Sequence, residues 1–70
     1  MAEVYAIRFD YPDGDILYAG MFKDALGWAP TLATALFFPS REAAGRTLAN
    51  GYGDSAEYGT IVAVNTEEVT

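Results

Sequence analysis

The sequence contains no cysteine and no histidine, and its only lysine is Lys23. Disulfides are therefore excluded, and the side chains that most often act as nucleophiles, general bases or metal ligands are missing. The absence of cysteine fits a reducing compartment, and Met1-Ala2-Glu3 leads straight into strand-like sequence without a basic or apolar signal segment. We therefore expect a cytoplasmic protein that is not an enzyme and uses no cofactor.

Long apolar runs are also missing. The longest, Ala33 to Phe38, is interrupted by Thr34 and stopped by Pro39, whereas a membrane span needs about 18 apolar residues. We therefore expect no contact with a membrane. The chain of 70 residues is predicted to be a single domain, residues 1–70, with a modest core, because a domain of this size hides only about 60% of the surface of its unfolded chain. Oligomerisation stays open as a source of stability.

Basic residues are scarce, with four of them against ten acidic residues and a formal net charge of −6. This charge disfavours direct binding to nucleic acid, because affinity for phosphates comes from lysine and arginine. It favours a protein partner with a basic surface. The alternative interpretation is that the charge only keeps a small domain soluble.

The first third of the chain has the pattern of a β-hairpin. Apolar and other residues alternate from Glu3 to Phe9, with Tyr5, Ile7 and Phe9 on one face. The segment Tyr11-Pro12-Asp13-Gly14-Asp15 has the composition of a tight turn, and an apolar run resumes at Ile16–Met21.

The next segment, Phe22–Pro30, is poorly periodic and is predicted to be a loop. Thr31 is a candidate cap for a short helical turn that extends to Ala35. Residues Leu36–Phe38 fit a short third strand, although a brief apolar run does not distinguish a strand from a buried helix.

A helix is predicted from Arg41 to about Asn50, with Ser40 as the N-cap and Glu42 in the first turn, where it complements the helix dipole. Gly51 suits the left-handed position just after the helix. After the helix, Tyr52–Gly59 is predicted to be an acidic loop. Thr60–Val64 is rich in β-branched residues and is predicted to be a central, well-buried strand. Residues 66–70 are predicted to be an acidic tail.

These elements predict an α+β fold. The simplest arrangement is a small, mainly antiparallel sheet of three to four strands, made from the N-terminal hairpin and the C-terminal strand, with one main helix on one face. The other face would expose apolar residues such as Val4, Ala6, Leu17 and Ala19. Exposed apolar sheet surface often marks an interface, so a homodimer through this face is one possibility.

Charge placement is the main functional signal. Asp10, Asp13 and Asp15 lie within six residues, but D-x-x-D-G-D lacks the spacing of a calcium-binding EF-hand loop, so no metal site is predicted. An antiparallel last strand would bring Asp54 and Glu57 to this end of the molecule, whereas a parallel one would bring Glu67 and Glu68. Carboxylates on alternate strand residues lie about 6.6 Å apart, a spacing of the same order as that of neighbouring phosphates.

Aromatic residues supply the second signal, because large rigid side chains dominate binding interfaces. Trp28 and Tyr52 are candidate anchors, with core packing as the competing interpretation, and Tyr58 is expected in the core. The predicted partner-binding residues are Asp10, Asp13, Asp15, Asp24, Trp28, Tyr52, Asp54 and Glu57.

In its length, its acidic surplus and its lack of catalytic residues, the chain resembles the anti-CRISPR inhibitors of bacteriophages and mobile elements. The acidic residues that carry this resemblance are Asp10, Asp13, Asp15, Asp24, Asp54 and Glu57. The resemblance implies a protein that binds a Cas effector complex and blocks its DNA or guide RNA site by mimicking nucleic acid. It implies no particular fold, because these inhibitors share none.

Two hypotheses follow. The first is a stoichiometric inhibitor whose acidic surface occupies a nucleic-acid site on a Cas effector complex. The second is a small homodimeric interaction or assembly domain of a phage or bacterium, in which the charge serves solubility and the open sheet face forms the interface.

Overall fold

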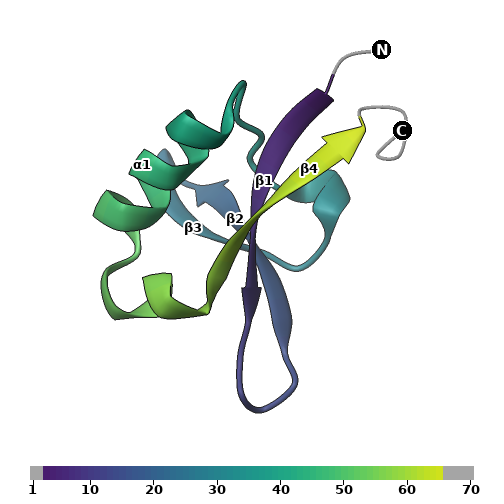
Figure 1. The fold of residues 1–70 in the computed structure, drawn as a ribbon. Helices are drawn as coiled ribbons and strands as arrows, with labels where there is room; N and C mark the ends of the chain where they lie inside the picture. Colours follow the sequence, from purple (N-terminus) through teal and green to yellow (C-terminus); the bar gives the residue numbers. More distant parts are fainter. Residues whose placement is uncertain (1–2, 66–70) are drawn as a thin grey trace.

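The computed structural model describes residues 3–65. Its elements, in chain order, are β1 (Glu3–Asp10), β2 (Ile16–Phe22), β3 (Ala25–Ala29), the 3₁₀ helix η1 (Leu32–Thr34), α1 (Arg41–Gly51), the 3₁₀ helix η2 (Gly53–Tyr58) and β4 (Gly59–Asn65). The four strands form one antiparallel sheet in the order β3-β2-β1-β4, with α1 as the main helix (Figure 1). The predicted α+β class is confirmed. The predicted tail, residues 66–70, lies outside the described residues.

The predicted first hairpin is confirmed. Strands β1 and β2 pair from Arg8 opposite Tyr18 to Asp10 opposite Ile16. In the turn the Tyr11 amide donates to the main-chain oxygen of Asp15 at 3.0 Å, and Gly14 has a φ of 96°, which glycine adopts without strain. Local turn chemistry therefore specifies this hairpin, as the sequence indicated.

A second hairpin replaces the loop expected at Phe22–Pro30, so that prediction was wrong. Strand β3 pairs with β2 from Phe22 opposite Ala25 to Tyr18 opposite Ala29. The turn consists of Lys23 and Asp24 with φ values of 50° and 63°, the left-handed geometry of a type I′ turn. Such turns usually carry asparagine or glycine, and lysine followed by aspartate does not indicate one in the sequence.

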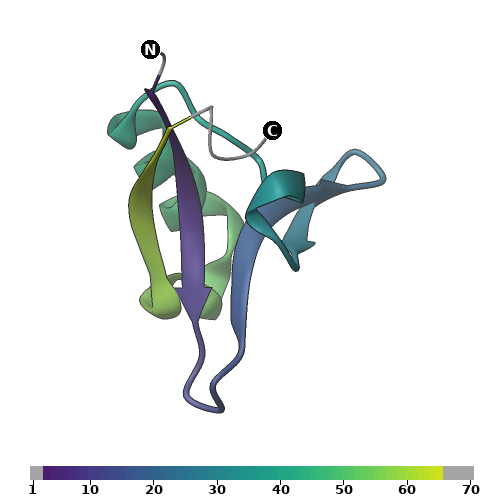
Figure 2. The same cartoon turned by 90° about the vertical axis from the view of Figure 1, so that its right-hand side faces the viewer.

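The segment Leu36–Phe38 lies between β1 and β2 where the two strands separate. The Leu36 amide donates to the Ala19 oxygen at 2.8 Å, and Phe38 exchanges two backbone hydrogen bonds with Tyr5, of 2.7 and 2.9 Å. The short strand considered for this segment is therefore a single bridge between Tyr5 and Phe38. Because of this insertion the sheet opens into two ribbons, β1 with β4 and β2 with β3 (Figure 2).

Strand β4 pairs with β1 in antiparallel register, from Glu3 opposite Asn65 to Phe9 opposite Gly59. The β-branched pattern predicted a strand correctly, but its central position was wrong, because β4 is an edge of the sheet. Of its residues, Val64 is buried, whereas Thr60 and Ala63 are exposed. β-branched residues thus indicate a strand without indicating its place in the sheet.

Helix α1 begins as predicted. The Ser40 hydroxyl oxygen accepts a hydrogen bond of 3.1 Å from the Ala43 amide, which satisfies one of the free amides of the first turn. The end of the helix differs from the prediction, because Gly51 is still helical and the left-handed residue is Gly53, with a φ of 54°. Tyr52, between them, turns into the core, and the chain continues into η2 in place of the expected acidic loop.

The short helical turn after Thr31 is also present, as η1. Its capping differs from the prediction, because the Thr31 hydroxyl lies 3.1 Å from the Thr34 hydroxyl and caps no backbone amide. The Thr34 hydroxyl in turn donates to the Thr31 main-chain oxygen at 3.1 Å.

The core lies between α1 and the sheet. Its buried members are Ile7, Phe9, Ala19, Phe38, Ala44 and Tyr52. The expected open apolar face was wrong in part, because Ala6 and Ala19 are both fully buried. The face predicted for Ala19 was wrong. Leu17 pairs with Phe9 and therefore lies on the core face, and Ala19, two residues further along β2, lies on the same face. Turn length sets this register, and composition alone does not reveal it.

Candidate functional site

Acidic residues from two separate segments meet at one end of the molecule. Phe9 pairs with Gly59, and the rings of Tyr11 and Tyr58 have centroids 5.2 Å apart, so η2 lies beside the base of the first hairpin (Figure 1). Of the two arrangements considered, the antiparallel one is observed. It brings Asp54 and Glu57, on η2, to the end that carries Asp10, Asp13 and Asp15. We call these five residues the acidic end. Glu67 and Glu68 lie outside the described residues.

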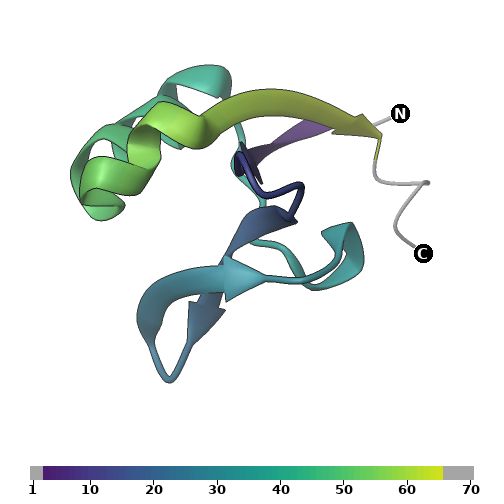
Figure 3. The ribbon, with the colours of Figure 1, turned by 90° about the horizontal axis from the view of Figure 1, so that it is seen from below.

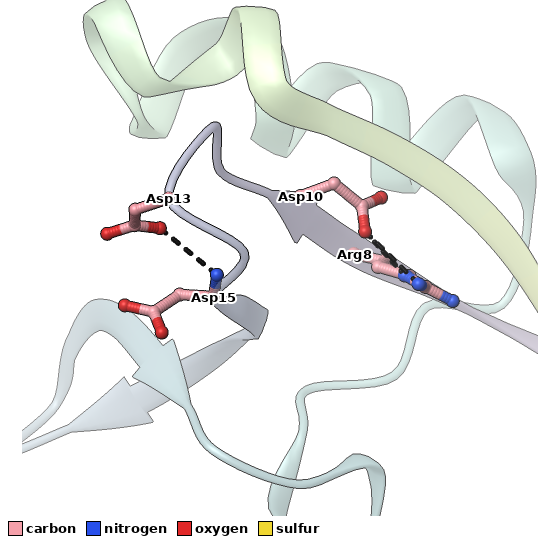
Figure 4. Close-up of polar contacts among 4 residues, drawn as sticks. All are labelled: Arg8, Asp10, Asp13 and Asp15. Carbon is pink, nitrogen blue, oxygen red and sulfur yellow. Dashed lines mark hydrogen bonds and ion pairs between the residues drawn. The ribbon is translucent and has the colours of Figure 1, made fainter.

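The five carboxylates of the acidic end are not equivalent. The Arg8 guanidinium contacts one oxygen of Asp10 through both Nε and Nη2, at 3.1 Å each, so Asp10 already has a cationic partner (Figure 4). The Asp13 carboxylate accepts a hydrogen bond of 3.0 Å from the Asp15 amide, which orders the turn (Figure 4). The carboxylates of Asp15 and Asp54 make no ion pair or side-chain hydrogen bond with any residue from 3 to 65.

Glu57 interacts with the neighbouring phenol. A hydrogen bond between the two side chains and the negative charge of Glu57 raise the pKa of Tyr58, with smaller contributions from burial and from Tyr11. The Tyr58 ring is partly buried against the core and contacts Tyr11, as expected for a core residue. Because Glu57 precedes Tyr58 on η2, and Tyr58 contacts Tyr11, Glu57 lies near the base of the hairpin.

Three predicted site residues are not part of the acidic end: Asp24, Tyr52 and Trp28. Asp24 occupies the turn between β2 and β3, at the far end of β2 from the first hairpin (Figure 2). Tyr52 is only 7% exposed and belongs to the core, so its predicted role as an exposed anchor is wrong. Its ring packs against Phe9 and Trp28, with centroids 4.9 and 5.4 Å away, and its hydroxyl donates to the Gly27 oxygen at 2.8 Å.

The pKa of Tyr52 is raised, and burial is the largest cause. A backbone hydrogen bond from Gly20 acts against this shift, and the charge of Tyr11 adds to it. The phenol thus joins the C-terminal end of α1 to the ribbon formed by β2 and β3. The sequence indicated no such role, because Tyr52 follows a helix and precedes a glycine, a pattern typical of a loop.

Trp28 has one side in the core and one in solvent. Its ring lies against Phe9 and Tyr52, yet 47% of the residue is exposed. Met21 and Leu26, which pair across β2 and β3, are 53% and 40% exposed and share a face with Trp28. We call Met21, Leu26 and Trp28 the β3 patch. The sequence does not indicate this group, because Phe22–Pro30 as a whole is poorly periodic, although Leu26-Gly27-Trp28 has the alternation of a strand.

Between residues 3 and 65 no three acidic side chains are grouped so that they could hold a metal ion, and no pocket is present. No helix in that range is long and apolar enough to cross a membrane. The two surfaces that stand out are the acidic end and the β3 patch.

No protein-family model, curated protein or solved structure matches the chain.

Proposed function

We propose that this chain is a non-enzymatic protein inhibitor whose acidic end occupies a lysine- and arginine-rich surface that otherwise binds nucleic acid. The observation that supports this most is the antiparallel pairing of β4 with β1. It brings together acidic residues that are separated by about forty positions in the sequence.

Asp15 and Asp54 are the two residues that support this proposal most. Both are exposed, and neither is compensated by a cation among the described residues. A basic partner can therefore pair with them without breaking an existing interaction, whereas pairing with Asp10 would compete with Arg8. The acid-rich composition of the whole chain adds long-range attraction, which speeds association with a basic surface and weakens as salt is added.

The resemblance to anti-CRISPR inhibitors gives the proposed partner, a Cas effector complex in the cytoplasm of a bacterial host. In this proposal the carboxylates take the places of phosphates, and the inhibitor acts stoichiometrically by excluding target DNA or guide RNA. A protein partner with a basic surface is required, and no cofactor takes part.

The test uses purified Cas effector complexes of several types and measures their affinity for the chain at low and high salt. The double substitution Asp15→Asn with Asp54→Asn is expected to weaken binding about tenfold at low salt, and by less at high salt. It is also expected to restore binding of target DNA by the effector.

Asp24→Asn is the matched control, because it removes the same kind of charge from an exposed turn far from the acidic end. Its affinity is expected to stay within about twofold of the original. An equal loss with Asp24→Asn would mean that net charge alone matters. Undiminished affinity of the double variant at low salt would contradict the mimicry.

A further inference from the structure

Strand β3 is an open edge of the sheet, with no described element beyond it (Figure 3). Its ladder with β2 begins at Phe22 opposite Ala25, next to the two-residue turn. In such a hairpin the pair that flanks the turn is hydrogen-bonded, and the orientation then alternates along the strand. The main-chain groups of Leu26 and Trp28 therefore point outward from the sheet.

The two edges of the sheet differ in how they are protected. On β4, the Arg41 guanidinium lies 3.5 Å from the Ile61 main-chain oxygen and is placed over the Tyr5 ring, 5.1 Å from its centroid. A charged side chain thus covers that edge, a common protection against unwanted strand pairing. Strand β3, Ala25-Leu26-Gly27-Trp28-Ala29, contains no charged residue and no proline.

The sequence of β3 is nearly the same in both directions: small, large, glycine, large, small. We propose that β3 pairs in antiparallel fashion with β3 of a second copy of this chain, about a twofold axis at Gly27. Leu26 then lies opposite Trp28 of the second copy, and their outward main-chain groups exchange hydrogen bonds. The large side chains of each such pair lie on the same face, and Gly27 meets only glycine.

Neighbouring twofold registers fit less well. If Trp28 lay opposite its own copy, Leu26 would face Pro30, which has no amide to donate. If Leu26 lay opposite its own copy, Trp28 would face Asp24, which would place a carboxylate against the ring. The register about Gly27 is the one that keeps the pairing within β3.

The size of the surface sets the strength of the dimer. The three residues of the β3 patch, between 40% and 53% exposed, leave on the order of 300 Å² of mostly apolar side chain in water. A stable interface buries about 800 Å² per partner, so this patch with its strand edge supports a weak dimer, in the micromolar to millimolar range.

The dimer interface and the acidic end are expected to respond to salt in opposite directions. Each copy has a formal net charge of −6, so two copies repel each other, and added salt screens that repulsion. Self-association is therefore expected to strengthen with salt, whereas binding of a basic partner by the acidic end weakens. The two proposals can fail independently.

Sedimentation at about 10 μM to about 1 mM protein, in about 50 and about 500 mM NaCl, tests the dimer. We expect a monomer–dimer equilibrium that shifts to dimer at high salt and weakens at least about tenfold in Leu26→Lys. Ile16→Lys is the matched control: Ile16 is 43% exposed, pairs with Asp10 and lies outside β3. It is expected to dimerise like the original chain.

Amide exchange by NMR gives a test that does not depend on how the variant folds. Exchange of the Leu26 and Trp28 amides is expected to slow as protein concentration rises, while the Gly27 amide, which faces β2, is unaffected. Each of three results would overturn the proposal. The chain could stay monomeric at every concentration, the exchange rates of the Leu26 and Trp28 amides could be independent of protein concentration, or Leu26→Lys could dimerise as strongly as the original chain.

Discussion

The hydroxyl of Tyr52 donates a hydrogen bond of 2.8 Å to the main-chain oxygen of Gly27. This contact joins the residue that follows α1 to the middle of the edge strand β3, 25 positions away. Around it the rings of Phe9, Tyr52 and Trp28 pack together. The position of β3, and with it the β3 patch, therefore depends on Tyr52, for which the sequence left open both an exposed anchor and core packing.

Tyr52→Phe removes this hydrogen bond and keeps the ring. We expect the free energy of unfolding to fall by about 1 kcal/mol, the usual contribution of a partly buried hydrogen bond, as measured by urea denaturation. Tyr5→Phe is the control, since the Tyr5 hydroxyl makes only an exposed contact of 3.3 Å with Glu3. It is expected to change stability by less than about 0.5 kcal/mol. Equal losses in the two variants would contradict this account.

Stability is expected to decline at alkaline pH. Burial, the largest cause, raises the pKa of Tyr52 above its ordinary value of 10.0. The folded protein thus keeps the phenolic proton when the unfolded chain has begun to release it, so this contribution is complete below pH 10.0 and is lost as pH rises through the folded pKa.

Urea denaturation from about pH 8 to about pH 11 checks this expectation. The Tyr52→Phe variant should lose stability less steeply with pH than the original chain. The raised pKa of Tyr58, which is due first to Glu57, acts in the same direction and persists in that variant. Identical slopes for the two proteins would show that Tyr52 does not contribute.

Two glycines are expected to respond in opposite directions to alanine. At Gly45, inside α1, an added Cβ would lie 3.6 Å from Ile61 Cδ1, an ordinary contact, so Gly45→Ala should stabilise the fold by about 0.5–1 kcal/mol through helix propensity. At Gly59 the added Cβ would lie 2.5 Å from Leu48 Cδ1 and 3.2 Å from Phe9 Cε1. Gly59→Ala should therefore cost about 1–3 kcal/mol.

Thermal unfolding of the two glycine variants side by side provides the measurement. The prediction concerns the sign of each change, because the same substitution is made in both places. Destabilisation by Gly45→Ala, or no effect of Gly59→Ala, would mean that the helix sits differently on β4.

The first hairpin and the start of α1 could be predicted because their causes are local. Pro12, Asp13 and Gly14 specify a turn through their own backbone preferences, and Ser40 caps a helix by bonding an amide three residues later. Such signals operate within a few residues, so they survive without knowledge of the rest of the fold.

The second hairpin could not be predicted in the same way. Its turn, Lys23-Asp24, takes left-handed geometry without the asparagine or glycine that usually indicates it. The pairing of β3 with β2 and the bond from Tyr52 to Gly27 hold that geometry in place, and both depend on residues outside the turn. The prediction of a loop at Phe22–Pro30 was therefore wrong because contacts with residues outside this turn stabilise the hairpin.

For the candidate site, the residue types were evident from the sequence, whereas their grouping was not. Asp13 and Asp15 are neighbours in one turn, but Asp54 joins them only because β4 runs antiparallel to β1. The same tertiary contacts separate Asp24 from this group and draw Tyr52 into the core.

The sequence by itself determined the α+β class, the first hairpin, the capped helix and the acidic character, because turn, capping and charge preferences belong to single residues and their near neighbours. Only the tertiary structure decided which strand became an edge, which small residues were buried and which carboxylates share one end. Those outcomes depend on strand register and on the insertion of Leu36–Phe38 between β1 and β2. Both are set by contacts between residues that are far apart in the chain.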